Sequence, residues 1–261
     1  MAPTSTLLHR SWATYLLLLL VPFIWVGCNN TDLPEVLPTG NLSGTVRVMT
    51  ELGEPLADLA NVAVLVTHTL TNEAYHSTTD AQGQFVISSL PIGRYNVIYS
   101  RSDVASYRFF NMLVLQDNNT QLRTVDLVEP ASIQPTEIKV DVDEVNQVVT
   151  ITGTIDPPSQ LFNKSRIRIF FSASSNPAND RYDDNISIVP VSPDTYIAQI
   201  QLAEFEFRGY VPGQRVHMIA YGSTDYVGDT YVDANTDLTI FTGLNPTPSV
   251  QTSVVMPVID Q

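Results

Sequence analysis

Residues 79–97 read TDAQGQFVISSLPIGRYNV, a pattern that predicts two short β-strands with a bend between them. Asp80 and Gly83 predict a tight turn, because an aspartate accepts hydrogen bonds from the backbone that follows it and glycine tolerates a positive φ. Apolar residues then alternate along a strand, bend at Pro91 and Gly93, and alternate again. The side chains expected to face inward are Phe85, Ile87, Leu90, Tyr95 and Val97. We interpret this stretch as part of a small β-sandwich, with its turn residues serving geometry and not chemistry.

Segments of the same kind lie on both sides of this stretch and predict a first domain over residues 40–130. The face of its first strand that alternation turns inward consists of Leu42, Gly44, Val46 and Val48. The further strands expected are residues 42–49, 62–67, 73–79, 107–115 and 121–128. With the two strands of the central stretch the count is about seven, which is usual for a sandwich.

The spacing of these residues resembles that of the carboxypeptidase regulatory-like domain, a transthyretin-like sandwich common in secreted and surface proteins of Bacteroidota. The pattern is G-x-V, then G-x-P-L, then T-D-x-x-G-x-F-x-I-x-x-L-P-x-G-x-Y-x-V. The residues that match it are Gly44, Val46, Gly53, Pro55, Leu56, Thr79, Asp80, Gly83, Phe85, Ile87, Leu90, Pro91, Gly93, Tyr95 and Val97. The resemblance covers about a third of the chain.

The resemblance implies an accessory module without a zinc site of its own. A metallopeptidase needs histidine and glutamate ligands at close spacing. His68 and His76 are expected on neighbouring strands without an H-E-x-x-H or H-x-x-E motif around them, so we interpret them as solvent-facing strand histidines. We therefore expect no peptidase activity and no cofactor.

A second all-β domain is expected over residues 136–257, after a short linker at residues 131–135. Its expected strands are residues 137–142, 147–155, 166–172, 186–191, 195–202, 215–221, a segment around 231, 238–241 and 253–256. The outline is similar to immunoglobulin or fibronectin type III modules, with Val216, Met218 and Ala220 facing inward. An immunoglobulin domain proper is excluded, because the segment lacks a cysteine pair and a core tryptophan. The fold class expected for the chain is two consecutive antiparallel β-sandwiches.

The N-terminal segment has the features of a signal peptide for secretion. Residues 15–26 form an uncharged apolar run behind a basic flank. The run is shorter than the roughly 20 residues that a membrane-spanning helix needs, so it fits the hydrophobic region of a signal peptide. Residues 1–27 are therefore expected to be removed.

The junction after this run resembles the lipobox of bacterial lipoproteins. Val26 and Gly27 precede Cys28, the only cysteine of the chain, and the resemblance implies that palmitate and other acyl chains are attached there. Residues 28–39 would then be a flexible tether. The localisation implied is the bacterial cell envelope, as an outer membrane lipoprotein facing the periplasm or the surface. The alternative is ordinary cleavage near Gly27, which leaves a free thiol.

Charge and composition limit the kinds of partner and ligand that the protein is expected to bind. The chain has 27 Asp and Glu against 13 Lys and Arg, and a formal net charge of −14. Such a surface repels phosphate backbones, so nucleic acid is excluded as a partner. Calcium ligands are conceivable in acidic loops, with Asp225, Asp229 and Asp233 as candidates, but no calcium-loop motif is present. Solvated turn aspartates are the plainer interpretation, and no metal site is expected.

Loop tyrosines offer a platform for sugar rings, because stacking favours flat aromatic groups with a polar tip. The candidates are Tyr182, Tyr226 and Tyr231, with Tyr210 nearby in sequence; the alternative is packing at the edge of the sandwich. Three functions follow. The first is a non-enzymatic surface lipoprotein that binds an envelope protein through loops or edge strands. The second is a carbohydrate-binding accessory protein of a glycan-uptake system, and the third is a hydrolase with a carboxylate pair.

Overall fold

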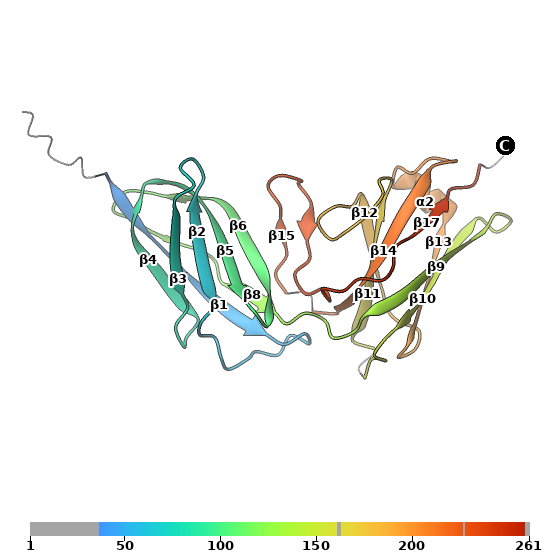
Figure 1. The fold of residues 1–261 in the computed structure, drawn as a ribbon, viewed down its shortest axis with the longest axis horizontal. Helices are drawn as coiled ribbons and strands as arrows, with labels where there is room; N and C mark the ends of the chain where they lie inside the picture. The colour runs from blue at the N-terminus through green and yellow to red at the C-terminus, as the bar shows by residue number, and fades with distance from the viewer. Residues whose placement is uncertain (1–36, 161–162, 227, 259–261) are drawn as a thin grey trace, which may run out of the picture. The chain divides into compact units, whose positions relative to one another are not determined.

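Strands make up nearly all of the regular structure in the computed structural model (Figure 1). The structure describes residues 37–160, 163–226 and 228–258. The expected signal peptide, Cys28 and nearly all of the tether lie outside these residues. Of the helices in the described chain, none has the length and the apolar character needed to cross a bilayer. The expectation of an all-β protein built from β-sandwiches is confirmed.

The first sandwich consists of two sheets that enclose a hydrophobic core. One sheet has β1 at its centre and contains β1 (Thr39–Met49), β4 (Gln84–Pro91), β7 (Asn119–Gln121) and β8 (Val125–Val128). The other contains, in spatial order, β3 (Ala74–Thr78), β2 (Ala63–His68), β5 (Gly93–Arg101) and β6 (Val104–Val114). The inward positions predicted along β1 are buried, because alternate residues of a strand face opposite sides of the sheet.

The 79–97 stretch forms the turn and the two strands that its residues predict. The Oδ1 atom of Asp80 accepts hydrogen bonds from the backbone N–H groups of Gln82 (2.9 Å) and Gln84 (2.8 Å). The residues predicted to face inward are all buried. Ser89 has a φ of 59° and lies where the pairing of β4 with β1 shifts; this irregularity brings both Ile87 and Leu90 inward. β4 and β5 belong to different sheets, so the bend between them carries the chain from one layer to the other.

Two expectations for the first sandwich were wrong in detail. The single strand predicted at residues 121–128 is two strands, because the buried Leu122 turns into the core between them. Both β7 and β8 pair with β1 in parallel, whereas the rest of the sandwich is antiparallel. Hydrophobic alternation is the same for both directions and therefore does not reveal this difference.

The second sandwich also has two sheets and its own hydrophobic core. One sheet contains β13 (Thr195–Gln201), β10 (Val148–Ile155) and β9 (Pro135–Asp143). The other contains β12 (Asp184–Ile188), β11 (Ser165–Ser172), β14 (Arg215–Thr224) and β17 (Thr252–Val255). Val216, Met218 and Ala220 are fully buried, as predicted.

Sequence alternation did not predict the short helix α2 (Leu202–Phe207) that follows β13. Its buried residues are Leu202 and Phe205, a spacing of three that turns both side chains to one side of a helix. The expected linker at residues 131–135 is also more than a spacer. Ala131 and Ile133 are buried, and the backbone N–H of Ala131 donates to the carbonyl oxygen of Gly243.

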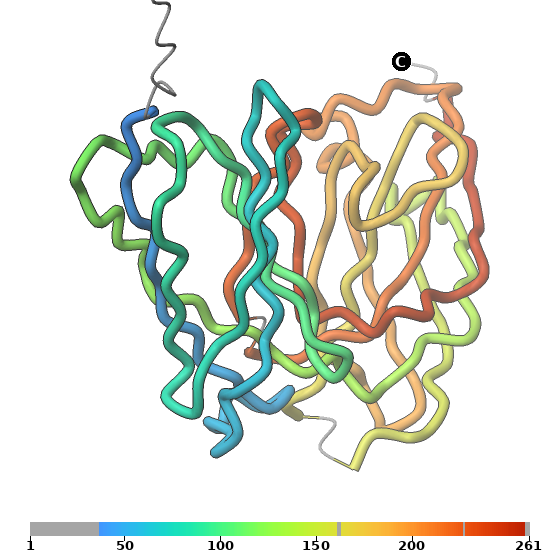
Figure 2. The backbone as a smooth tube through the Cα atoms, turned by 60° about the vertical axis from the view of Figure 1, so that its left-hand side comes forward, coloured from blue at the N-terminus to red at the C-terminus, as the bar shows by residue number. Residues whose placement is uncertain are grey.

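A small hairpin of the second half contacts the first sandwich. It consists of β15 (Tyr231–Val232) and β16 (Thr239–Ile240). Figures 1 and 2 both show this hairpin between β6 and the second sandwich. Through its contact with β6, the hairpin brings residues of the two halves of the chain together.

Candidate binding site at the junction of the two sandwiches

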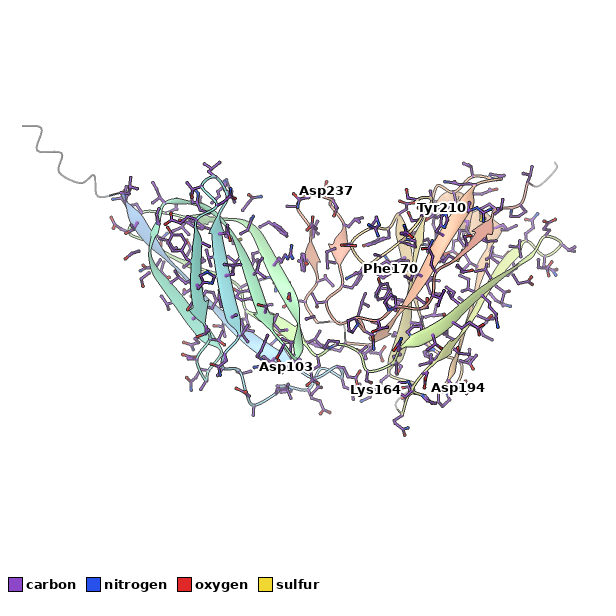
Figure 3. The ribbon with its side chains drawn as sticks, viewed as in Figure 1. Asp103, Lys164, Phe170, Asp194, Tyr210 and Asp237 are labelled. Carbon is purple, nitrogen blue, oxygen red and sulfur yellow. The ribbon has the colours of Figure 1, made fainter. Side chains whose placement is uncertain are left out.

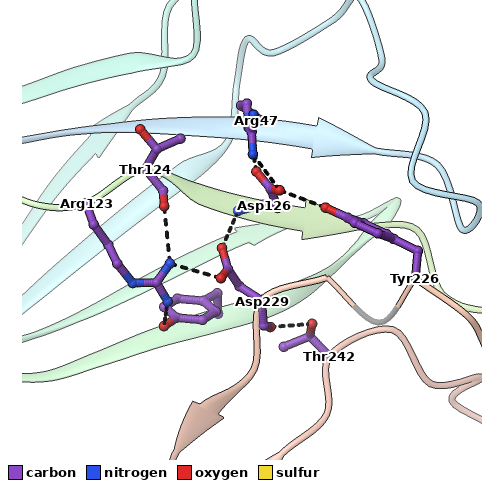
Figure 4. A network of polar contacts seen from close by, with 8 residues as sticks. Arg47, Arg123, Thr124, Asp126, Tyr226, Asp229 and Thr242 are labelled. Atoms are coloured by element: carbon purple, nitrogen blue, oxygen red, sulfur yellow. Dashed lines mark hydrogen bonds and ion pairs between the residues drawn. The ribbon is translucent and has the colours of Figure 1, made fainter.

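An arginine and an aspartate on neighbouring strands form the base of the junction. Arg47 lies between the buried Val46 and Val48, so alternation places it on the outer face of β1. Asp126 lies directly opposite Arg47 on β8. Arg47 Nε and Nη2 donate to the two carboxylate oxygens of Asp126 at 2.6 and 2.7 Å (Figure 4). This two-pronged contact fixes the orientation of the carboxylate.

Tyr226 reaches the same carboxylate from the second half of the chain. Its hydroxyl donates to Oδ2 of Asp126 at 2.7 Å. Burial alone would raise the pKa of Asp126, but the hydrogen bonds from Arg47 and Tyr226 lower it below its ordinary value. Burial and the contact with Asp126 raise the pKa of Tyr226 to about 12. At neutral pH the carboxylate is therefore charged and the phenol is a donor.

Asp229 provides a second connection between the two halves. Arg123 Nη1 donates to its Oδ1 at 2.9 Å, and the backbone N–H of Asp126 donates to its Oδ2 at 2.7 Å (Figure 4). Arg123 also donates to the hydroxyl of Tyr107. The neighbouring Gly228 has a φ of 65°, and a Cβ there would lie 2.8 Å from the side chain of Val128. Only a glycine fits this close approach without displacing the strand.

The hairpin then extends over an aromatic surface of the first sandwich. The ring of Tyr231 lies 5.4 Å from that of Tyr107 and 6.2 Å from that of Phe110, measured between centroids. The hydroxyl of Thr242, just after β16, donates to the carbonyl oxygen of Asp229 at 2.8 Å. Ring packing and the contacts of Asp229 thus hold the start of the hairpin on the first sandwich, and Thr242 joins its end to Asp229.

A cleft of about 330 Å³ opens beside the hairpin. Its lining residues come from β6, from the loop between β11 and β12, from β14 and from the hairpin. They are Arg108, Ala178, Asn179, Asp180, Tyr221, Tyr231, Asp233 and Ile240. We call this hollow the junction cleft.

Hydrogen bonds hold one wall of the junction cleft in place. The side chain of Asn179 donates to the carbonyl oxygen of Phe241 at 2.9 Å and accepts from its N–H at 3.1 Å. Phe170, labelled in Figure 3, packs against the rings of Tyr182, Tyr221 and Phe241. The end of β16, through Phe241, and the β11–β12 loop, through Tyr182, therefore both pack on the ring of Phe170.

The cleft combines aromatic rings with charges of both signs. Burial raises the pKa of Tyr221 and of Tyr231, so both hydroxyls stay protonated at neutral pH. Arg108 and Asp180 are exposed, and neither side chain has a hydrogen-bond partner within the described part of the chain. Such a lining offers hydrogen-bond donors and acceptors together with flat apolar faces. It therefore suits a polar ligand with hydroxyl groups.

The structure separates the tyrosines that were considered as one sugar platform. Tyr231 lines the cleft, whereas the hydroxyl of Tyr226 is bound to Asp126. Tyr182 packs on Phe170 with a centroid distance of 4.8 Å and donates to the carbonyl oxygen of Thr239. Tyr210, labelled in Figure 3, is buried in the second core. Only one of the four therefore lies in the cleft.

The three aspartates considered for calcium have different partners. Asp225 pairs with Arg166, Asp229 pairs with Arg123, and Asp233 accepts hydrogen bonds from the backbone of its own turn. Over residues 37–160, 163–226 and 228–258, no group of three or more His, Cys, Asp and Glu side chains is placed to hold a metal ion.

The two strand histidines have different environments. His76 is exposed, but the expectation that His68 faces solvent was wrong. His68 is half-buried, its ring packs 4.9 Å from that of Tyr95, and its Nδ1 accepts N–H groups of the turn that follows. The hydrogen bonds to the turn give the ring a structural role at the end of β2.

Sequence reasoning missed the cleft residues Arg108, Asn179 and Tyr221. They lie on a strand, a loop and another strand that are far apart in the chain. None belongs to a motif, and the exposed position of Arg108 on β6 looks like any polar position of a half-buried strand. Asn179 and Tyr221 meet within the second half of the chain, and the packing of the hairpin against β6 adds Arg108 to them.

The fold places the protein among all-β proteins built from β-sandwiches. Residues 41–128 match the family model described as the carboxypeptidase regulatory-like domain. This match confirms the resemblance seen in the sequence, and it covers the first sandwich. No curated protein matches the chain.

Solved structures of Bacteroides and Parabacteroides proteins show a distant likeness. A candidate carbohydrate binding protein from Bacteroides uniformis is 14% identical, with a TM-score of 0.32, over 84% of this chain and 100% of that one. A DUF3823 family protein from Bacteroides uniformis is 16% identical, with a TM-score of 0.31 and the same coverage. Another from Parabacteroides merdae is 11% identical, with a TM-score of 0.28, over 82% and 99% of the two chains. Values this low carry nothing about function.

Proposed function

We propose that the protein is a non-enzymatic binding module of the bacterial cell envelope. It is held on the outer membrane through acylated Cys28, facing the periplasm or the surface, and binds its partner in the junction cleft. The observation that carries this proposal is the cleft, where unpaired polar groups lie beside aromatic rings. The regulatory-like domain supports it as well, because the resemblance implies an accessory module.

The walls of the cleft are held by interactions that exist without a ligand. The Arg123–Asp229 pair and the Tyr226–Asp126 hydrogen bond fix the start of the hairpin, and Asn179 fixes its end. A preformed site avoids the entropic cost of ordering loops on binding. The partner expected first is an envelope protein that presents a polar loop to this surface.

A carbohydrate is the second candidate ligand. The rings of Tyr221 and Tyr231 and the charged groups of Arg108, Asp180 and Asp233 line one hollow. Sugars offer apolar ring faces and many hydroxyl groups, which such a lining can contact at once. Two of these groups are carboxylates, which is also what the hydrolase alternative needs. A binding module returns the glycan intact, whereas a hydrolase shortens it.

The cleft is tested by two exposed residues whose replacement leaves the core untouched. We expect Arg108→Ala and Asp180→Asn each to weaken binding of the partner at least about tenfold, which corresponds to about 1.4 kcal/mol. Arg215→Ala and Asp141→Asn are matched controls, since both residues are exposed and lie outside the cleft. Photo-crosslinking from position 108 in intact cells is the probe for a protein, with position 215 as its control.

The probe for a carbohydrate is an array of polysaccharides with the full chain in detergent. A crosslinked protein at position 108 but not at 215 supports the first candidate, and array binding that the two cleft variants lose supports the second. Shortened glycans after incubation would establish a hydrolase. Equal loss of binding in the cleft variants and the controls would contradict the cleft as the site.

The anchor is tested at Cys28. We expect palmitate labelling of the full chain in bacterial cells to disappear in Cys28→Ala, because acylation requires the thiol. The variant should leave the membrane fraction, since acyl chains contribute about 0.8 kcal/mol per buried CH₂. Labelling that persists in Cys28→Ala would rule out the anchor.

A further inference from the structure

Four large apolar side chains are exposed at one end of the first sandwich. Leu70 is 86% exposed, Ile92 45%, Leu113 44% and Leu115 49%. Exposed apolar residues scattered singly are ordinary, but a group of them marks an interaction surface. We call these four residues the apolar end.

Strand pairing brings the four residues together although they come from three parts of the chain. Ile92 lies in the bend before Gly93, which pairs with Val114 of β6, between Leu113 and Leu115. The turn that carries Leu70 begins at Thr69, whose N–H donates to the carbonyl oxygen of Arg94 at 2.9 Å. The apolar end is thus formed by the β2–β3 turn, the β4–β5 bend and the end of β6.

The chain enters the first sandwich at this same end. The carbonyl oxygen of Pro38 accepts a hydrogen bond from the N–H of Ile92 at 3.1 Å, and Thr39 pairs with Pro91. A Cβ on Gly40 would touch the carbonyl oxygen of Leu115. Figures 1 and 2 both show the start of β1 and the β2–β3 turn at one end of the sandwich.

The position of Cys28 in the sequence indicates what can cover the apolar end. Cys28 precedes Pro38 by ten positions, and ten residues span at most about 36 Å when fully extended. Acyl chains on Cys28 therefore keep Pro38, at the apolar end, within about 36 Å of the bilayer, whatever path the intervening residues take. Charged residues of both signs have backbone hydrogen bonds at this end, namely Arg94, Glu73 and Asp117, so an uncharged lipid surface fits better than an anionic one.

We propose that the apolar end lies against the lipid bilayer, with Leu70, Ile92, Leu113 and Leu115 among the lipid headgroups. The inference rests on the proposed acylation of Cys28. Transfer of apolar side chains out of water favours this contact and adds to the hold of the acyl chains. It fixes one end of the sandwich to the membrane and leaves the junction cleft to face the partner.

The test uses the full chain, acylated in bacteria and reconstituted into phosphatidylcholine vesicles. Leu70→Cys and Leu113→Cys each introduce a thiol for an environment-sensitive nitrobenzoxadiazole label, since the sulfur of acylated Cys28 is a thioether and does not react. We expect blue-shifted emission and strong quenching by brominated lipids at both positions. Phe207→Cys is the matched control, because Phe207 is 93% exposed and belongs to the second sandwich.

Absence of quenching at position 70, or equal quenching at positions 70 and 207, would overturn the contact with the bilayer. A blue shift that needs a high protein concentration but no lipid would mean that a second copy covers the apolar end, and would overturn it too. Label uptake by the wild-type chain would show that Cys28 is free, which refutes the anchor separately. Insertion is then measured at position 70 in the Cys28→Ser background.

Discussion

Asp229→Ala is expected to lower the free energy of unfolding by about 3 kcal/mol, because it removes two charge-assisted hydrogen bonds and leaves Arg123 without its carboxylate. Asp229 accepts from Arg123 and from the backbone N–H of Asp126. Only 27% of its side chain is exposed, so water replaces these contacts incompletely. Urea denaturation of the full chain in detergent, followed by tyrosine fluorescence, measures the change.

Asp225→Ala is the matched control for this prediction. Asp225 lies four positions earlier and also forms an ion pair, with Arg166, but 53% of its side chain is exposed. An exposed pair contributes about 0 to 1 kcal/mol, so the control should differ little from the wild type. Equal losses in the two variants would show that Asp229 has no special part in joining the halves.

Asp229→Ala is expected to weaken partner binding as well as stability. The hairpin begins two residues after Asp229 and supplies Tyr231, Asp233 and Ile240 to the junction cleft. When the side-chain contacts of Asp229 are lost, the start of the hairpin keeps the ring packing on Tyr107 and Phe110 and the Tyr226–Asp126 hydrogen bond. We therefore expect weaker partner binding in Asp229→Ala even under conditions where both sandwiches remain folded.

Local physics explains which parts of the fold were predictable. The Asp80 turn and the burial of Phe85 and Val97 depend on neighbours within a few residues, so the sequence pattern identified them. The parallel pairing of β8 with β1 depends on residues 79 positions apart, such as Arg47 and Asp126. Alternation along a strand carries no information about such a partner.

The cleft was unpredictable for a related reason. Arg108 and Tyr231 come from different halves of the chain and meet only because the hairpin crosses to β6. Tyr226 and Tyr182 looked equivalent to Tyr231 in sequence, but their hydroxyl groups are used by Asp126 and by the Thr239 carbonyl. Their residue type made all three tyrosines candidates for ligand binding. Long-range packing determines that only one of the three, Tyr231, lines the cleft.

Gly83→Ala is expected to cost about 3 to 4 kcal/mol of stability, through the positive φ, a backbone collision and a lost hydrogen bond. Gly83 has a φ of 73°, and an added Cβ would lie 2.1 Å from the carbonyl oxygen of Val46. The carbonyl oxygen of Gly83 also accepts from the N–H of Val46 at 2.8 Å. An alanine therefore pushes the turn away from β1 at the point where the two are hydrogen-bonded.

Gly209→Ala separates the two contributions. Gly209 also has a positive φ, of 94°, but a Cβ there meets nothing within 4 Å, so the cost should be about 1 kcal/mol from backbone conformation alone. Thermal unfolding of both variants beside the wild type measures the difference. If Gly83→Ala lost no more than Gly209→Ala, the turn would not be held against β1. Residues 79–97 would then owe their place to the buried Phe85 and Tyr95 and not to the turn.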